Sequence, residues 1–380
     1  MRRRSLPKRT NSRRFGSIKK FIYILIFIVL LLVGIKVLVI AKSYGPFIFQ
    51  LIFNHDISLS SNNGQVNILL LGIGGASHDG PNLTDTIILA SVDQSKNSLT
   101  LLSIPRDLWI PEMKGKINTA YAIGQNKQLG DGLILAKAAV ERVTGQQINY
   151  GVRLDFGGFV KAVNLLGGLN IDVVRTFDDY QYPIEGKEDD TCGESQQQIQ
   201  DIATASSELE AFPCRYKHIH FTSGLQHMDG ETALEYVRSR HAIGIEGSDF
   251  ARSAREEKVI ATLKNKILSA ETLLNPSKII ALYEVLKDSV DTDIPEDKFD
   301  DFIRLGQKLR GAKIHTYVID EGDTTQNRPG LLINPTSNLQ DYGFQWTLIP
   351  RVGNGNYSEI QKYTNCILIS VNCTVAKTSM

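Results

Sequence analysis

The chain has 380 residues, of which 42% are hydrophobic and 22% are charged, and its formal net charge at pH 7 is +1. These values are typical of a globular protein and exclude a fibrous or intrinsically disordered chain. The first twenty residues contain six Arg, three Lys and no acidic residue. Removing those nine charges from the total of +1 leaves −8 for residues 21–380, which excludes a general nucleic-acid-binding body.

An apolar segment follows the basic tail. Residues 21–40 are apolar except for Lys36, and twenty such residues are long enough to cross a bilayer. They predict a single transmembrane signal anchor over residues 21–41, with residues 1–20 in the cytoplasm because positive charge stays inside. Residues 42–65 then form a stalk, and the remaining chain lies outside the cell membrane. A cleaved signal peptide is the alternative, although no clear small-residue cleavage site follows.

Three β-rich apolar segments open the body of the chain, separated by polar connectors with Gly or Asn: residues 67–71, 86–92 and 99–104. This pattern predicts a strand meander. Residues 130–144 then show helical spacing up to Gly145, and Asp155 can cap a further helix between two strands. The alternation predicts an α/β fold, in which helices flank a mixed central sheet in three layers.

The predicted domain spans residues 66–270. Residues 271–380 are either its C-terminal part or a small extension. In that region we expect a Pro-initiated helix over residues 278–290, and strands at residues 313–320, 345–350 and 366–370. Residues 178–214 are rich in acidic and amide side chains and predict a solvated insertion.

Four cysteines are present: Cys192, Cys214, Cys366 and Cys373. An even number in an extracytoplasmic domain, grouped in this way, predicts the local disulfides Cys192–Cys214 and Cys366–Cys373. The sequence does not fix the connectivity. A zinc site is an alternative without the usual ligand spacing, and four free thiols are another.

Charged residues lie at the ends of the meander strands. Asp79 and Asp85 flank the Gly-rich first connector, and Arg106 and Asp107 follow the third strand and Pro105. Two carboxylates beside an arginine can hold a divalent cation together with a phosphate oxygen. A surface turn with ordinary helix caps is the alternative.

Arginines gather in a second region, after the insertion. Within eighteen residues the chain has Arg238, Arg240, Arg252 and Arg255. Asp229 can cap a short helix through residue 236 or 237, after which the first two arginines share one side if their segment is extended. Asp249 can cap a second helix, which would place the last two arginines on one helix face. The group predicts either a phosphate cradle or helices held by ion pairs to nearby glutamates.

Six segments, taken in their order along the chain, resemble those of a known family: NILLLGIG, LTDTIILASVD, LTLLSIPRDLWI, KINTAYAIG, GLQHMDGETALEYVRSRH and DFARSAREEKVI. They cover roughly residues 66–268 and resemble the LytR-CpsA-Psr (LCP) family of membrane-anchored phosphotransferases of bacterial cell walls. The resemblance implies transfer of a phosphoglycan, such as teichoic acid or capsule, from undecaprenyl pyrophosphate to peptidoglycan. It also implies Mg²⁺ at the pyrophosphate, with Mn²⁺ as a substitute.

The same resemblance assigns roles to individual residues. Asp85 matches the metal-site aspartate, Arg106 the first phosphate-binding arginine, and Arg238 with Arg240 the catalytic pair of the VRSRH segment. Two more arginines match those that bind pyrophosphate from the last helix, namely Arg252 and Arg255.

The sequence departs from the family pattern in three places. Gly74 stands where an aspartate is common, Leu83 and Thr84 where an arginine precedes the SDT triplet, and Glu256 where glutamine is usual. Asp79 is the predicted replacement for the missing metal carboxylate. The neighbouring His78 is either a further ligand or an exposed loop histidine without a role. A lipid-pyrophosphate hydrolase and a non-catalytic polyprenyl-phosphate sensor are the rival functions.

Overall fold

The computed structural model describes residues 56–75, 80–128, 130–195, 208–267, 269–273, 275–323, 328–335, 339–370 and 373–375. The chain divides into two compact units, Met1–Ile57 and Ser58–Met380, and the second holds every element discussed below. The predicted tail and anchor lie outside the described residues, as does most of the stalk. Among the residues described, no helix is long and apolar enough to cross a membrane.

A six-stranded sheet forms the centre of the second unit, in the order β11-β6-β1-β2-β3-β12. Its strands are β1 (Gln65–Ile73), β2 (Thr84–Asp93), β3 (Ser98–Ser103), β6 (Tyr150–Asp155), β11 (Val290–Thr292) and β12 (Lys313–Val318). β1, β3, β6 and β12 are parallel to one another, whereas β2 and β11 run in the opposite direction. The predicted meander and mixed sheet are therefore confirmed, and the C-terminal part supplies both edge strands.

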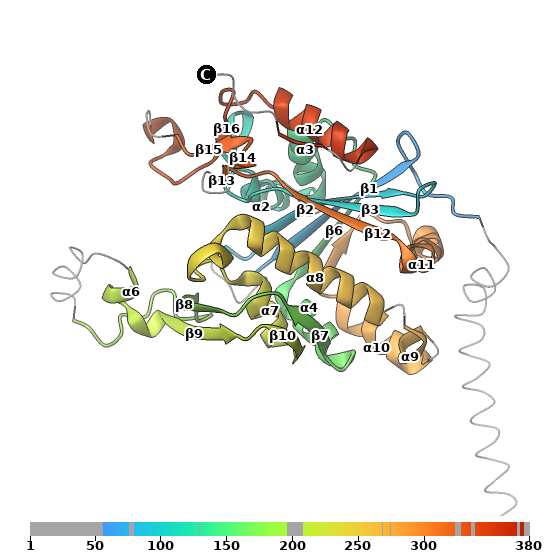
Figure 1. Ribbon diagram of the computed structural model, residues 1–380, viewed down its shortest axis with the longest axis horizontal. Coiled ribbons are helices and arrows are strands. Elements are labelled where there is room, and N and C mark those ends of the chain that lie inside the picture. Colours follow the sequence, from blue (N-terminus) through green and yellow to red (C-terminus); the bar gives the residue numbers. More distant parts are fainter. Residues whose placement is uncertain are drawn as a thin grey trace, which may run out of the picture. The chain divides into compact units, whose positions relative to one another are not determined.

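Helices cover both faces of this sheet (Figure 1). One face carries α2 (Ala120–Lys127), α3 (Gly132–Thr144) and α12 (Ser358–Ile369), whose apolar side chains join the main core with Leu69, Leu89 and Leu102. The other face carries α4 (Phe156–Leu165), α7 (Gly230–Arg238), α8 (Asp249–Ile267) and α10 (Pro276–Leu286). The three predicted layers are thus present, because amphipathic helices bury their apolar stripes against the sheet.

Two antiparallel strand pairs extend the layer formed by α4, α7, α8 and α10. β7 (Leu169–Val173) pairs with β10 (Gly224–Met228), and β8 (Phe177–Pro183) pairs with β9 (Tyr216–Phe221). The prediction of a solvated insertion from residue 178 was wrong for its first part, because β8 buries Phe177, Asp179 and Tyr182. Phe177 and Asp179 show the period of two of a strand with one buried face, and a register shift between Asp179 and Tyr182 interrupts this period. The predicted disulfide Cys192–Cys214 is confirmed.

The C-terminal region matches its predictions in part. α10 begins with Pro276, after an Asn275 cap that accepts a hydrogen bond from the Lys278 amide. The predicted strand at residues 366–370 was wrong, because this segment ends α12, in which Ile360, Thr364 and Ile367 are buried at helical spacing. A short apolar run does not by itself distinguish the two structures. The second predicted disulfide, Cys366–Cys373, is confirmed.

The remaining short elements connect these layers. They are β4 (Trp109–Ile110), β5 (Gly115–Lys116), α6 (Glu208–Ala211), α9 (Ala270–Leu273), α11 (Phe299–Lys308), β13 (Gly322–Asp323), β14 (Arg328–Pro329), β15 (Leu332–Ile333) and β16 (Ile349–Pro350).

Candidate active site at the carboxyl ends of the parallel strands

A β-bulge places Asp85 at one edge of the sheet. β1 and β2 pair Gly72 with Thr86 and Ile73 with Thr84, so Asp85 is an extra residue on β2. Such a bulge bends its strand and redirects the side chain, and bulges are common next to active sites. The Asp85 carboxylate accepts a hydrogen bond from Arg106, which follows β3 at the same edge.

The carboxylate of the next residue, Asp107, lies close to three cationic side chains. Its Oδ1 atom lies 2.8 Å from Lys116 Nζ, and its Oδ2 atom lies 3.6 Å from Arg106 Nε and 3.5 Å from Arg240 Nη2. Burial acts to raise the pKa of this carboxyl, but the hydrogen bond from Lys116 and the nearby positive charges outweigh burial, so the pKa lies below its ordinary value. Asp107 thus stays ionised and holds two arginines of distant segments together.

The end of α7 explains how Arg240 reaches Asp107. Asp229 caps this helix by accepting a hydrogen bond from the Thr232 amide, as predicted, and the helix ends at Arg238. The hydroxyl of the next residue, Ser239, is buried and donates to Asp179 Oδ2 at 2.7 Å. This bond holds the chain where it leaves the helix, and Arg240 then extends to the sheet edge.

Arg238 takes a different direction. Arg238 and Arg240 were expected to share one side only if their segment is extended. Arg238 is instead the last residue of α7, so this condition is not met. Its guanidinium lies over the Phe156 ring, 4.6 Å from the ring centre. A Cβ atom on Gly72 would lie 3.4 Å from the same ring, so Arg238 also lies near the end of β1.

Arg252 reaches this edge through Glu256. The two residues form an ion pair within α8, with 3.5 Å between Nη1 and Oε1. The same Glu256 oxygen accepts a hydrogen bond from the Thr86 hydroxyl at 3.4 Å. Since Thr86 follows Asp85 on β2, the pair fixes α8 beside the bulge. We call the residues gathered here the strand-end cluster: Asp85, Arg106, Asp107, Arg238, Arg240 and Arg252.

Arg255 does not belong to this cluster. Its guanidinium donates to the carbonyls of Tyr236, Ser239 and Glu246 at 2.7–2.9 Å and to the Glu246 carboxylate at 3.1 Å. Only 2% of the residue is exposed, and burial lowers its pKa. In this structure Arg255 connects α8 to the end of α7 and the segment that follows it. Its predicted binding of pyrophosphate stays a prediction.

Comparison with known sequences shows to which family the chain belongs. The sequence model of the LytR_cpsA_psr family matches residues 49–341, more than half of the chain. The chain belongs to the LytR_cpsA_psr family. The resemblance seen in the sequence is therefore confirmed, and the matched residues include those of the strand-end cluster.

The chain is also similar to individual proteins and to a solved structure. The polyisoprenyl-teichoic acid–peptidoglycan teichoic acid transferase TagU of Enterococcus faecalis is 27% identical over 258 residues, covering 66% of this chain and 68% of TagU. TagV of Bacillus subtilis is 27% identical, covering 60% of this chain and 49% of TagV, so the match spans about half of that relative. The crystal structure of B. subtilis TagV has the same fold, with a TM-score of 0.51 at 23% identity, covering 80% of this chain and 97% of TagV.

One departure from the pattern that the resemblance implies is the missing carboxylate at Gly74. Asp79 and His78 lie outside the described residues, so their predicted role as metal ligands stays a prediction. Gly74 carries no side chain, but Asp155 lies near it. Asp155 on β6 pairs with Ile73 on β1, and a Cβ atom on Gly75 would lie 3.3 Å from the Asp155 Cβ atom.

Asp155 was identified from the sequence only as a helix cap. It does cap α4, since its Oδ1 atom accepts a hydrogen bond from the Gly158 amide at 2.7 Å. Its place on the far side of β1 from Asp85 depends on β6 pairing with β1, which the sequence did not reveal. The available signal was a carboxylate directly after a predicted strand, where sites in open α/β sheets are built.

Proposed function

We propose that the protein transfers a phosphate-linked glycopolymer, of teichoic acid or capsule type, from undecaprenyl pyrophosphate to peptidoglycan at the outer face of the cell membrane. Relatives named as teichoic acid transferases and as a cell wall biosynthesis protein support a transferase of this class. The observation that carries the proposal is the strand-end cluster, in which Asp107 pairs both with the adjacent Arg106 and with Arg240, 133 residues further along the chain. Ligands of open α/β sheets bind at this edge, outside the carboxyl ends of parallel strands.

The arginines of the cluster suit a pyrophosphate. A guanidinium donates two parallel hydrogen bonds to phosphate oxygens, and its charge stabilises the departing phosphate. Asp85 orients Arg106 through their ion pair, and Asp107 positions Arg106 and Arg240 together. The cluster would thus bind the donor in a fixed orientation, and such positioning together with charge stabilisation supplies most of the catalysis in phosphoryl transfer.

The proposed reaction exchanges one phosphate bond for another. A peptidoglycan hydroxyl oxygen bonds to the phosphorus that carries the glycan and releases its proton to solvent. The bond between that phosphorus and the bridging oxygen breaks, and undecaprenyl phosphate leaves with the oxygen. A phosphodiester to peptidoglycan results, and no covalent intermediate with the protein is required.

Mg²⁺, with Mn²⁺ as a substitute, is the proposed cofactor. Asp85 offers carboxylate oxygens, and its side chain is 29% exposed at the strand end. In the described ranges no group of three His, Cys, Asp or Glu ligands gathers at this edge. Mg²⁺ commonly takes only one or two carboxylates and adds water and phosphate oxygens, so this donor set fits it. Asp85 would hold the ion, with Asp79 as the proposed second ligand, and the ion would neutralise pyrophosphate charge.

The proposed location is the cell membrane, with residues 21–41 as a single-pass anchor and the amino terminus in the cytoplasm. The basic tail and the apolar run of the sequence support this topology. It would hold the strand-end cluster on the side where peptidoglycan lies and where a lipid-linked donor is presented.

The test is a transfer assay with the full chain in detergent. The donor is a polyprenyl pyrophosphate carrying a labelled saccharide, and the acceptor is purified peptidoglycan. We expect labelled peptidoglycan and free polyprenyl phosphate in equal amounts, and loss of both with Arg240→Ala. Arg142→Ala is the matched control, because Arg142 is 58% exposed and pairs with Glu112 away from the cluster. Release of free saccharide phosphate at the same rate with and without acceptor would show a hydrolase instead.

A further inference from the structure

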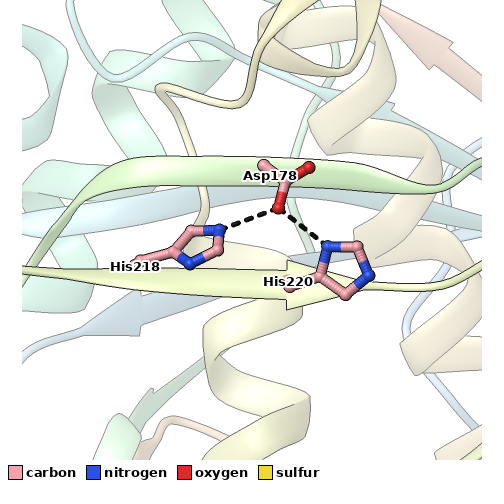
Figure 2. Close-up of side chains that lie close together, drawn as sticks. All are labelled: Asp178, His218 and His220. Carbon is pink, nitrogen blue, oxygen red and sulfur yellow. Dashed lines mark hydrogen bonds and ion pairs between the residues drawn. The ribbon is translucent and has the colours of Figure 1, made fainter.

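A cluster of three potential metal ligands lies on the outer face of β8 and β9. Asp178 and His220 face each other across the two strands, and His218 is two residues earlier on β9, which places it on the same face. Asp178 Oδ1 lies 2.7 Å from His218 Nε2 and 2.7 Å from His220 Nδ1. Figure 2 shows both rings turned toward this carboxylate. The three ligand atoms lie within 4.8 Å of one another.

We propose that Asp178, His218 and His220 bind a transition-metal dication of the zinc class. Two imidazoles and one carboxylate are ligands that zinc, cobalt and nickel favour, whereas Mg²⁺ prefers oxygen ligands alone. Around a zinc ion with bonds of about 2.1 Å, ligand atoms lie about 3.4 Å apart. The two hydrogen bonds therefore need to open by less than about 1 Å to admit the ion.

The surroundings of the cluster hold the ligands in position. The Tyr180 ring stacks on the His218 ring, with 4.2 Å between ring centres and 6° between ring planes. The second nitrogen of His220, Nε2, lies 3.3 Å from the Thr222 hydroxyl. A hydrogen bond at the far nitrogen leaves Nδ1 as the metal-facing nitrogen, and such supporting contacts are typical of histidine ligands.

Open space adjoins the two histidines. A hollow of about 340 Å³ lies beside them, and its other lining residues include Gln226, Thr232 and Glu235. Three protein ligands leave one position of a tetrahedral shell for water, and the side chains of both histidines are exposed to solvent. Only one other group of three such ligands occurs in the described ranges, and two of its members, Cys192 and Cys214, form a disulfide.

The proposed metal site is connected to the segment that carries Arg240. The Asp178 carbonyl accepts a hydrogen bond from the Ile243 amide at 2.9 Å, and Asp179 forms a bridge with Ala242. Asp179 is fully buried and accepts hydrogen bonds from Ser239 Oγ and the His241 amide. A metal that joins β8 to β9 would therefore stabilise the strand on which the Arg240 segment rests.

The test is a titration of the metal-free full chain with Co²⁺, whose visible absorption reports nitrogen and oxygen ligation. Excess Mg²⁺ is present throughout, so that the strand-end cluster is not the site observed. We expect one equivalent of Co²⁺ to bind and to be displaced by Zn²⁺. His218→Gln, His220→Gln and Asp178→Asn should each weaken binding at least about tenfold.

His227→Gln is the matched control. His227 is another exposed histidine, on the neighbouring β10, and its ring contacts Asn170. We expect its Co²⁺ affinity to stay within about twofold of the wild type, since no ligand of the proposed site changes. Glutamine and asparagine preserve hydrogen-bonding capacity, so metal-free variants should unfold at the wild-type temperature. Absence of saturable binding, or unchanged affinity in all three site variants, would overturn the proposal.

Discussion

Two arginines of the same region have opposite surroundings. Arg240 is 28% exposed in its side chain and shares Asp107 with Arg106 at the sheet edge. The Arg255 side chain is 3% exposed and donates four hydrogen bonds to backbone carbonyls and to Glu246. A guanidinium has five N–H donors, so little of Arg255 is left for a ligand. The family pattern alone does not separate these two roles.

This difference predicts different effects of truncation. Arg255→Ala leaves three carbonyls and a buried carboxylate without their donor, which should lower the free energy of unfolding by about 3–5 kcal/mol. Arg240→Ala removes a partly exposed side chain and should lower it by less than about 1 kcal/mol. Urea unfolding of both variants measures the difference. Equal destabilisation would contradict the separation of the two roles.

Asp107 should make the stability of the protein depend on acid pH. Its pKa is depressed in the folded protein, so its contribution is fully present above the unfolded pKa of about 3.9 and is lost as pH falls through the folded pKa. Asp107→Asn removes this contribution at every pH. We expect the wild type to exceed the variant in unfolding free energy near neutral pH and the gap to narrow below about pH 4. A gap that stays constant down to acid pH would show that the charge of Asp107 is unimportant for folding.

At the scale of elements, local patterns predicted most strands and helices of the core. The meander, α3 with its Gly145 end, the caps of α4 and α7, and the start of α10 at a proline follow from spacing and from a few residues each. The pattern failed where burial was hidden by polar neighbours, as in β8, and where an apolar run was short, as at the end of α12. In both cases the partner that decides the structure lies far away in the sequence.

The two disulfides allow a test at this scale. Cys192–Cys214 closes a loop of 22 residues and Cys366–Cys373 one of 7. On the chain-entropy estimate their removal should lower the unfolding free energy by about 3 and about 2 kcal/mol. Thermal or urea unfolding of the paired Cys→Ala variants measures both values. A larger loss from the shorter loop would show that native contacts, rather than the unfolded chain, determine the effect.

At the scale of the whole molecule, the site is assembled by the order of strands in the sheet. From the sequence we predicted a mixed α/β sheet and phosphate-binding roles for five arginines. We did not predict that β6 would lie beside β1. Asp155 was therefore missed as a neighbour of Ile73 and Gly75. The different directions of Arg238, over Phe156, and of Arg240, toward Asp107, were not predicted either. Both follow from contacts between segments more than 70 residues apart, which no local pattern contains.

The central claim is that the strand-end cluster binds pyrophosphate. Its most direct test is calorimetric titration of the full chain with a short polyprenyl pyrophosphate in the presence of Mg²⁺. Arg106→Ala and Arg240→Ala should each weaken binding about tenfold or more, because each removes a charged hydrogen bond to phosphate. Arg240→Lys should recover little of the affinity, since an ammonium group lacks the two-pronged geometry. Arg142→Ala should bind as the wild type does, whereas wild-type affinity in both Arg106→Ala and Arg240→Ala would contradict the account.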